Sequence, residues 1–261
     1  MATRCNDGTA EHIRQHFPRV KLLSFSATVG IPKLRAAAMA EATGKIIAVT
    51  EDHCVVAEDW FLEIMKAHQL GYAVVGGAVE NGMTDRILDW SVFLCEYSSA
   101  MLPVPPGEVS YIPGNNVAYK RAALEMIDDT FKQNFWEFFW HERLKQTGIK
   151  FLSVPSMLVI HKKKFGFFYF LSQRFHYSRS FAAMRRLLVP ASKRFYYLLA
   201  SPLLPVVMAW RITRDIFWNK KRLYKQFIFA VPSLAVFLIS YAMGEFVGYL
   251  LGPGNSLSKV E

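Results

Sequence analysis

The sequence predicts an α/β domain, in which helices flank a mostly parallel sheet, followed by an α-helical, membrane-associated C-terminal region. Before His161, short apolar runs alternate with segments of helical spacing, which is the pattern of βα units. After His161 the composition changes to basic, aromatic and long apolar segments. We therefore expect an α/β domain over 1–165, a basic amphipathic segment over 166–194, and a hydrophobic region over 195–261 with one or two membrane spans.

The first elements of the α/β domain are indicated by helical spacing and by residues typical of helix ends. Residues 8–17 have helical spacing, and a short strand ends near Ser26. Pro32 stands in a first helical turn and Gly44 in a C-cap position, because proline tolerates the start of a helix and glycine its end. A helix is therefore expected between them.

The next segments continue the alternation, with a strand over 46–49, a helix over 60–70 and a strand over 73–79. This βαβα order implies a parallel sheet with helices on its faces. Residues 102–116 are rich in Pro and Gly and predict a long loop, and such loops in compact domains are usually functional or disordered. We then expect a helix from near Lys120, a helix over 135–146 and a strand over 150–160.

The net charge of +10 is unevenly distributed. Residues 161–225 hold 15 of the 31 Lys and Arg residues but only one of the 21 acids, Asp215, so the rest of the chain is mildly acidic. Basic residues beside apolar segments fit an anionic membrane surface better than nucleic acid. We expect membrane lipids, and no nucleic acid, as partners.

Two apolar stretches follow the basic segment. Residues 195–210 contain Pro202 and Pro205 and are marginal for a span, which needs about 20 residues. Residues 227–252 are the better candidate, and Glu245 would then lie in or near the bilayer. The basic loop between the stretches should stay cytosolic, so a cytosolic α/β domain implies that the first stretch does not cross fully.

Several classes of protein lose their usual sequence support. The three cysteines, Cys5, Cys54 and Cys95, have no CxxC spacing, so neither a disulfide framework nor a zinc site is expected. No apolar leader is recognised at the N-terminus, so we expect the α/β domain to face the cytoplasm. No P-loop, GxGxxG, HExxH or GxSxG pattern is present, which argues against nucleotide triphosphatases, Rossmann dehydrogenases, zincins and α/β-hydrolases.

A polar cluster follows the apolar strand that ends at Val49. Glu51, Asp52 and His53 offer oxygen and imidazole ligands at the position where ligands bind in α/β sheets. His161 follows the last predicted strand and would join them if the two strand ends converge. The set suits Mn²⁺ or Mg²⁺, and the imidazoles favour Mn²⁺. A plain polar turn and a structural histidine are the alternatives.

Two further features could carry chemistry. Glu137 stands among aromatic residues, where burial would raise the pKa of its carboxyl and suit it as a general base. A helix N-terminal acid that interacts with the helix dipole is the alternative, and Glu142 competes with it for the role. Asn115 and Asn116 follow Pro113-Gly114, where glycine permits close backbone approach and the amides could bind sugar hydroxyls or phosphate. A simple turn is the alternative for this loop.

Taken in order, these residues resemble the family 2 glycosyltransferases of GT-A fold, over roughly residues 5–165. The Asp7-Gly8-Thr9 segment resembles the family's Asp-Gly-Ser/Thr turn, and Glu51-Asp52-His53 stands in the slot of its DxD motif. Trp60-Phe61-Leu62 follows where the family often has a Trp-Leu pair, and residues 113–121 are similar to its acceptor-side segment. Glu137 falls on the catalytic base of inverting members, and His161 resembles a late histidine that completes the metal site.

The resemblance implies an inverting, metal-dependent transfer of a sugar from a nucleotide-activated donor to a hydroxyl acceptor. Asp7, Glu51, Asp52, Asn115 and Asn116 would then contact the nucleotide-sugar. The C-terminal part resembles the membrane tails of bacterial members, which implies a lipid-linked or membrane-delivered acceptor. The family's opening strand and helix are not recognised in this sequence, so an N-terminal truncation is expected.

Two alternatives remain at this level. The first is an inactive, membrane-bound interaction module that keeps the fold without binding nucleotide. The second is a phosphotransferase that acts on lipid carriers and releases a nucleoside monophosphate rather than a diphosphate.

Overall fold

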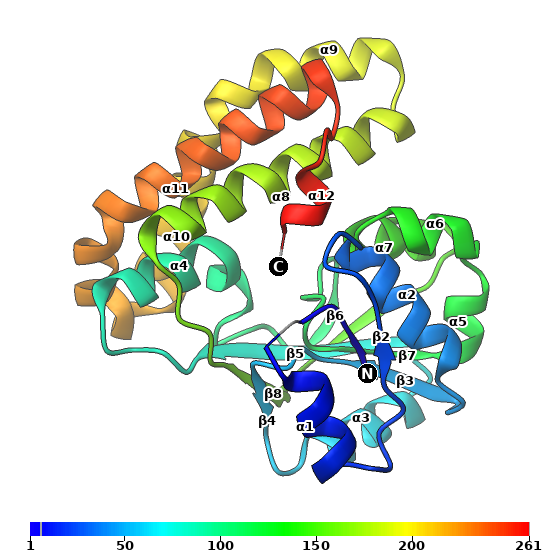
Figure 1. Cartoon of the computed structure of the whole chain (residues 1–261). Helices are drawn as coiled ribbons and strands as arrows, with labels where there is room; N and C mark the ends of the chain where they lie inside the picture. Colours follow the sequence, from blue (N-terminus) through cyan, green and yellow to red (C-terminus); the bar gives the residue numbers. More distant parts are fainter. Residues whose placement is uncertain (6, 261) are drawn as a thin grey trace.

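The computed structural model describes residues 1–5 and 7–260, so Asn6 and Glu261 lie outside its description. Figure 1 shows an α/β domain below a layer of long C-terminal helices, in the order that the sequence predicts. The two regions share apolar contacts throughout, so they form one packed body.

In the described part of the chain, the central sheet has six strands. Their order is β3 (Ile46–Val49), β7 (Val117–Lys120), β5 (Val74–Asn81), β8 (Phe151–His161) and β4 (Cys54–Val56), with β6 (Gly107–Val109) paired to β8. Only β5 and β8 pair in parallel within this sheet; the other neighbours are antiparallel. The expectation of a mostly parallel sheet is therefore wrong.

The error comes from three short strands that the sequence pattern does not reveal. Strands β4, β6 and β7 have three or four residues each, too few to show a period, and they lie in segments read as a turn, a loop and a helix start. Strand β7 runs antiparallel between β3 and β5, so these two strands share a direction without being neighbours.

The side chains of the strands point alternately to the two faces of the sheet, and each face is covered by an apolar layer. Val75, Ala118 and Leu152 pack against α3 (Trp60–Gln69) on one face of the sheet. Val74 and Phe151, whose side chains point to the opposite face, pack under the other helices of the domain. These are α2 (Ile31–Glu41), α5 (Arg121–Glu125), α6 (Asp129–Asn134) and α7 (Glu137–Gln146).

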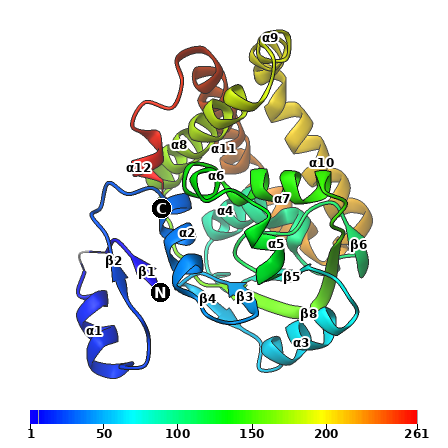
Figure 2. The ribbon, with the colours of Figure 1, turned by 90° about the vertical axis from the view of Figure 1, so that its right-hand side faces the viewer.

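The N-terminal residues form a small unit beside the main body, as Figure 2 shows. Strands β1 (Ala2–Thr3) and β2 (Leu23–Ser24) pair in parallel, and α1 (Thr9–His16) lies between them in sequence. The expected helix and the expected strand near Ser26 are both present.

Helix α4 (Ile87–Tyr97) was not expected. Phe93 and Leu94 are fully buried, and the segment is apolar around most of its circumference, so no amphipathic stripe marks it as a helix. It lies between the sheet and the C-terminal helices, where both sides are covered.

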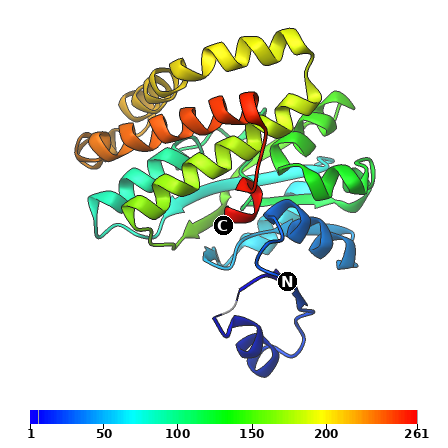
Figure 3. The same ribbon diagram turned by 45° about the horizontal axis from the view of Figure 1, so that its top comes forward.

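The C-terminal helices cross the domain as successive bands (Figure 3). They are α8 (Phe167–Leu188), α9 (Ala191–Ala200), α10 (Leu204–Asn219), α11 (Tyr224–Leu251) and the short α12 (Ser256–Lys259). Helix α8 is covered by the domain on one side and by α11 on the other, with Phe170 and Ala182 fully buried. The protein itself therefore covers the apolar residues in the middle of α8, whereas Phe168 and Leu187 near its two ends are exposed.

Candidate active site

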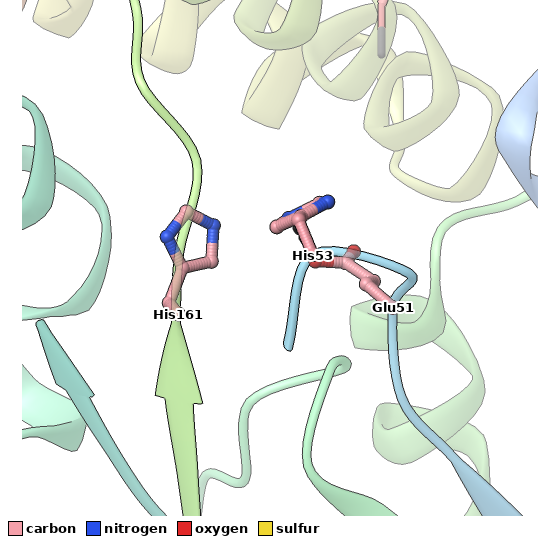
Figure 4. Close-up of side chains that lie close together, drawn as sticks. All are labelled: Glu51, His53 and His161. Carbon is pink, nitrogen blue, oxygen red and sulfur yellow. Dashed lines mark ion pairs between the residues drawn. The ribbon is translucent and has the colours of Figure 1, made fainter. Parts of the chain in front are cut away.

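Two strand ends bring Glu51, His53 and His161 together. Strand β4 pairs with β8 so that Cys54 lies opposite His161, which places the preceding residue, His53, beside that strand end. The two imidazole rings are 4.6 Å apart between centroids at an angle of 83°. One ligand atom from each of the three residues lies within 4.8 Å of the others. Figure 4 shows Glu51 and His53 on one loop, facing His161 at the end of β8.

His53 is held between two carboxylates. Its Nε2 is 3.1 Å from Glu51 Oε2, and its Nδ1 is 2.9 Å from Asp52 Oδ1. Burial opposes a charged ring, but hydrogen bonds to Asp52 and Glu51 outweigh it and raise the pKa of His53 to about 9. Burial likewise opposes ionisation of Glu51, but its hydrogen bond with His53 and the charge of Arg35 lower its pKa to about 2.

His161 is buried and has a different electrostatic environment. Burial, together with the positive charge of His53, lowers its pKa to about 4, so its ring is neutral at physiological pH. A neutral imidazole is a metal ligand. The three residues thus offer one carboxylate and two imidazoles, a donor set that fits a divalent transition ion such as Mn²⁺.

Arg35 lies at the centre of the site and was not identified from the sequence. Its Nη2 is 2.5 Å from Glu51 Oε1, and its Nη1 forms an ion pair with Glu137. Burial disfavours the charge, but Glu137 and Glu51 outweigh this and raise the pKa of Arg35 further. The available signal was one of two cations, Lys33 and Arg35, in an alanine-rich helix, and only the tertiary structure shows that Arg35 reaches the site.

Glu137 is placed where a proton acceptor could act. It begins α7, is 6% exposed, and faces the Glu51 loop across Arg35. Glu142, its competitor from the sequence, is half-exposed and pairs with Lys145 at 2.5 Å, away from the site. The backbone at Gly114 packs closely here, since a Cβ on this residue would lie 3.0 Å from Arg35 Nη1 and 3.4 Å from Glu137 Oε2. The expected close approach of the loop is therefore present.

The two asparagines of this loop differ in their surroundings. The Asn116 amide donates to the carbonyls of Ala78 and Met157 at 2.8 and 2.7 Å, and its Oδ1 accepts from Trp60 Nε1 at 2.9 Å. Asn116 is fully buried, so its expected role in nucleotide binding is wrong: the side chain links β5, β8 and α3 instead. Asn115 approaches Cys54 Sγ at 3.8 Å, and its Oδ1 accepts no hydrogen bond within the described residues.

Asp7 and Asp52 lie toward the outside of the site. The Asp7 carboxylate accepts a hydrogen bond from the Thr9 backbone at 3.1 Å and from the Thr9 hydroxyl at 2.5 Å, which lowers its pKa. Asp52 is exposed and contacts His53 rather than Arg35. Both remain accessible to a ligand.

Helices α4 and α8 add a wall that sequence reasoning missed. The Tyr97 ring lies 5.1 Å from the His161 ring, and the neighbouring Glu96 forms an ion pair with Arg174 of α8. Arg174 also stacks over the Tyr177 ring at 5.2 Å. The first C-terminal helix is therefore part of the site's surroundings.

Comparisons with known proteins agree with this geometry. Residues 4–128 match the sequence profile of Glycosyl transferase family 2. The matched segment includes Arg35, Glu51 and His53. A search of curated protein sequences finds no match. The solved structure of the mannosyltransferase PcManGT from Pyrobaculum calidifontis, in complex with GDP-Man and Mn²⁺, is similar over 94% of this chain and 76% of that chain. The TM-score is 0.53 and the sequence identity 16%, so this similarity shows the fold alone.

Fold and sequence profile together define a GT-A-like glycosyltransferase, an enzyme that transfers a sugar from a nucleotide-sugar donor. With its family domain at residues 4–128, the protein is a glycosyltransferase family 2 enzyme. The family resemblance found in the sequence is thereby confirmed. Glu137 and His161 lie outside the matched segment, so their roles rest on the geometry of the site.

Proposed function

We propose that the protein is an inverting, metal-dependent glycosyltransferase that transfers a sugar to a hydroxyl acceptor at a membrane. One observation carries the proposal: Glu51, His53 and His161 form a compact ligand set, and Arg35 connects it directly to the buried acid Glu137. A sugar transfer needs positive charge beside the diphosphate of the donor. It also needs a proton acceptor beside the hydroxyl of the acceptor.

Glu51, His53 and His161 would hold Mn²⁺ or Mg²⁺, with Asp52 as an outer oxygen donor. A divalent ion in this position offsets the negative charge that develops on the departing diphosphate. The likeness to an enzyme solved with GDP-Man and Mn²⁺ supports a nucleoside diphosphate sugar as donor. Asp7 and Asn115 are the nearby polar groups that remain available to the nucleotide.

Glu137 would take the proton of the acceptor hydroxyl while that oxygen attacks the anomeric carbon. Direct displacement of the diphosphate inverts the configuration at this carbon. Arg35 now pairs with both Glu51 and Glu137, and a guanidinium can form the same two-pronged contact with phosphate oxygens. An incoming diphosphate would therefore compete for Arg35 and leave Glu137 free to accept the proton.

The membrane part of the proposal rests on the C-terminal region. Among the described residues, two helical stretches, Ala191–Asn219 and Lys221–Leu251, are long and apolar enough to cross a membrane. With the basic residues around them, they would hold the α/β domain at the cytoplasmic face. A lipid-linked or membrane-delivered acceptor could then reach the site, which α8 borders.

The alternative of an inactive interaction module predicts that the site binds no nucleotide. We expect GDP-mannose with Mn²⁺ to raise the melting temperature of the detergent-solubilised protein, and a chelator to remove the effect. A panel of other nucleotide-sugars covers the choice of base and sugar. Absence of stabilisation by every donor, with and without Mn²⁺, would favour the inactive module.

Replacement of Glu137 tests the chemical assignment. Glu137→Gln should keep donor binding but lower the transfer rate by about 10²–10⁴-fold, because the amide cannot accept the proton. Glu142→Gln is the matched control on the same helix and should transfer at the normal rate. Unimpaired turnover of Glu137→Gln would overturn the assignment of the base.

A further inference from the structure

The chain on either side of α11 is attached to the α/β domain, at Arg222 just before the helix and at Val260, nine residues after its last residue, Leu251. At its N-terminal end, Arg222 Nη2 lies 2.6 Å from Glu80 Oε1 of β5 and 3.1 Å from the Leu102 carbonyl. At its C-terminal end the chain turns into α12, where the Lys259 carbonyl accepts from Gln173 Nε2 at 2.9 Å and the Val260 carbonyl accepts from Arg4. Val260 itself is buried in the core of the α/β domain.

The helix between these attachments is longer than the hydrocarbon core of a bilayer is thick. Its 28 residues extend about 42 Å at 1.5 Å per residue, more than the roughly 30 Å hydrocarbon core of a bilayer. If α11 crossed a membrane, its ends would lie on opposite sides. The α/β domain contacts the chain on both sides of α11, at Arg222 and at Val260, and α8, which packs on that domain, contacts the C-terminal end of the helix. The domain would therefore have to stand inside the bilayer, which its charged surface forbids.

From Phe237 onward, α11 packs on α8. Phe237 meets Phe170 with ring centroids 4.7 Å apart, and Ser240 Oγ donates to the Leu171 carbonyl at 2.8 Å. Further along, the helix backbones nearly touch, because a Cβ on Gly244 would lie 2.3 Å from the Phe175 carbonyl oxygen. No part of α11 between these contacts can tilt away from α8 without breaking them.

Helix α8 in turn lies flat on the α/β domain. Its first half packs with α4, where Phe170 joins the cluster that contains Phe93. Its second half packs with α7, where the Phe139 and Phe181 rings are 4.8 Å apart and Trp136 Nε1 donates to Ser180 Oγ at 3.1 Å. The sheet, α8 and α11 are therefore stacked layers, as Figure 3 shows from above.

The outer face of this stack is apolar and exposed. The most apolar part of Ala191–Asn219 is only 11% buried in the protein. Its exposed side chains include Leu203, Val206 and Trp210, and Phe229 and Leu251 of α11 continue the same kind of surface. Apolar surface of this extent marks a site of association.

The charges near this face distinguish a lipid surface from a second copy of the chain. Exposed basic residues stand at its ends, Lys193 at the start of α9 and Lys221 and Lys225 around the start of α11. Residues 161–225 contain Asp215 as the single acid. Two copies meeting through this face would bring basic ends together, whereas anionic headgroups would complement them.

We infer that α9, α10 and α11 lie in the plane of the membrane, with their outer face in one leaflet of an anionic bilayer, and that neither apolar stretch crosses it. The inference builds on the membrane part of the proposed function and replaces the expected one or two spans by none. The whole described chain then stays on one side of the membrane, with the apolar side chains inserted and the basic residues at the headgroups.

Thiol labelling in sealed membrane vesicles of both orientations tests this topology. Three exposed positions flank the two stretches: Ser192→Cys, Lys221→Cys and Asn255→Cys, each in a Cys5→Ser background. A membrane-impermeant maleimide should label all three from the cytoplasmic face only. Labelling of Ser192→Cys and Lys221→Cys, or of Lys221→Cys and Asn255→Cys, from opposite faces would overturn the inference.

A fourth variant, Val206→Cys, tests the insertion itself, since Val206 is 69% exposed. It should resist the reagent from both faces in vesicles and react in the detergent-solubilised monomer. Free reaction in vesicles, or protection by self-association without lipid, would contradict the lipid assignment. The labelling needs no sugar transfer, so a failed transfer assay with this labelling pattern would remove the proposed chemistry and leave the topology standing.

Discussion

The polar site and the outer helix face differ in where their side chains find partners. At the site, Arg35, Glu51, His53 and Glu137 are buried or half-buried, and each charge has an opposite partner within the protein. On the outer face, side chains such as Val206 and Phe229 are left mostly exposed by the described residues. A buried charge without a partner is costly, so the site had to be completed internally, whereas the apolar face can be completed by lipid.

The largest effect is expected from breaking the pairing at the site. Arg35→Met leaves Glu51 and Glu137 facing each other without a cation, which should lower the free energy of unfolding by about 3–5 kcal/mol. Urea denaturation in detergent measures it. Arg14→Met, which removes an exposed partner of Glu11, should change stability by less than about 0.5 kcal/mol.

The double variant sharpens the interpretation of this loss. If the cost arises from uncompensated carboxylates, adding Glu137→Gln to Arg35→Met should restore part of the stability, as a double-mutant cycle would show. Additive losses in the cycle would mean that the guanidinium acts by packing alone.

The next largest effect is the difference in stability loss between substitutions on the inner and outer faces of α11. Phe237 is fully buried and Phe229 is 66% exposed, although both belong to α11. Phe237→Ala should cost about 3–4 kcal/mol through the cavity it leaves, and Phe229→Ala about 0.5 kcal/mol or less in detergent. Phe229→Ala should instead weaken retention on anionic liposomes in a flotation assay. Equal stability losses for the two variants would contradict the two-faced description of α11.

A smaller effect should follow from separating α11 and α8. Gly244→Ala places a methyl group 2.3 Å from the Phe175 carbonyl oxygen and should cost about 1–3 kcal/mol, because the helices must shift apart. Gly166→Ala is the control, since its nearest atom would be Tyr169 Cβ at 4.0 Å. A thermal melt that does not distinguish the two variants would argue against close packing at Gly244.

The effect that is smallest at neutral pH is a pH dependence from the buried His141. His141 hydrogen-bonds the Tyr119 hydroxyl through Nε2 at 2.7 Å, and burial, with the charge of Lys145, lowers its pKa from 6.5 to about 3. Below pH 6.5, His141 is therefore protonated in the unfolded chain but stays neutral in the folded chain. Stability should fall by about 1.4 kcal/mol for each pH unit below 6.5 until pH 3 is approached.

His141→Gln isolates this contribution, because glutamine can keep a hydrogen bond to Tyr119 without titrating. The variant should show a shallower decline in unfolding free energy between pH 6.5 and 4 than the unaltered protein. Parallel pH profiles for the two proteins would assign the acid sensitivity to other groups.

The sequence predicted the order of most elements because their signals are local. The helix with Pro32 in its first turn, the strand before Glu51, and the strand that ends at His161 all have residues whose own preferences define them. The expected C-cap at Gly44 is wrong, because the helix already ends at Glu41 with Ala42 as its C-cap. Helix α4 and strand β7 were missed because the first is apolar on nearly all sides and the second has four residues. Neither carries a periodic pattern.

By itself, the sequence determined the kind of residue available for chemistry and the family of the enzyme, since composition, motif order and strand ends depend only on the chain. The tertiary structure alone decided three matters: that Arg35 joins Glu51 to Glu137, that the Asn116 side chain is hydrogen-bonded within the protein, and that the chain on both sides of α11 contacts the α/β domain. Each depends on contacts between segments distant in the chain, and no local preference encodes the distance between two side chains that only packing brings together.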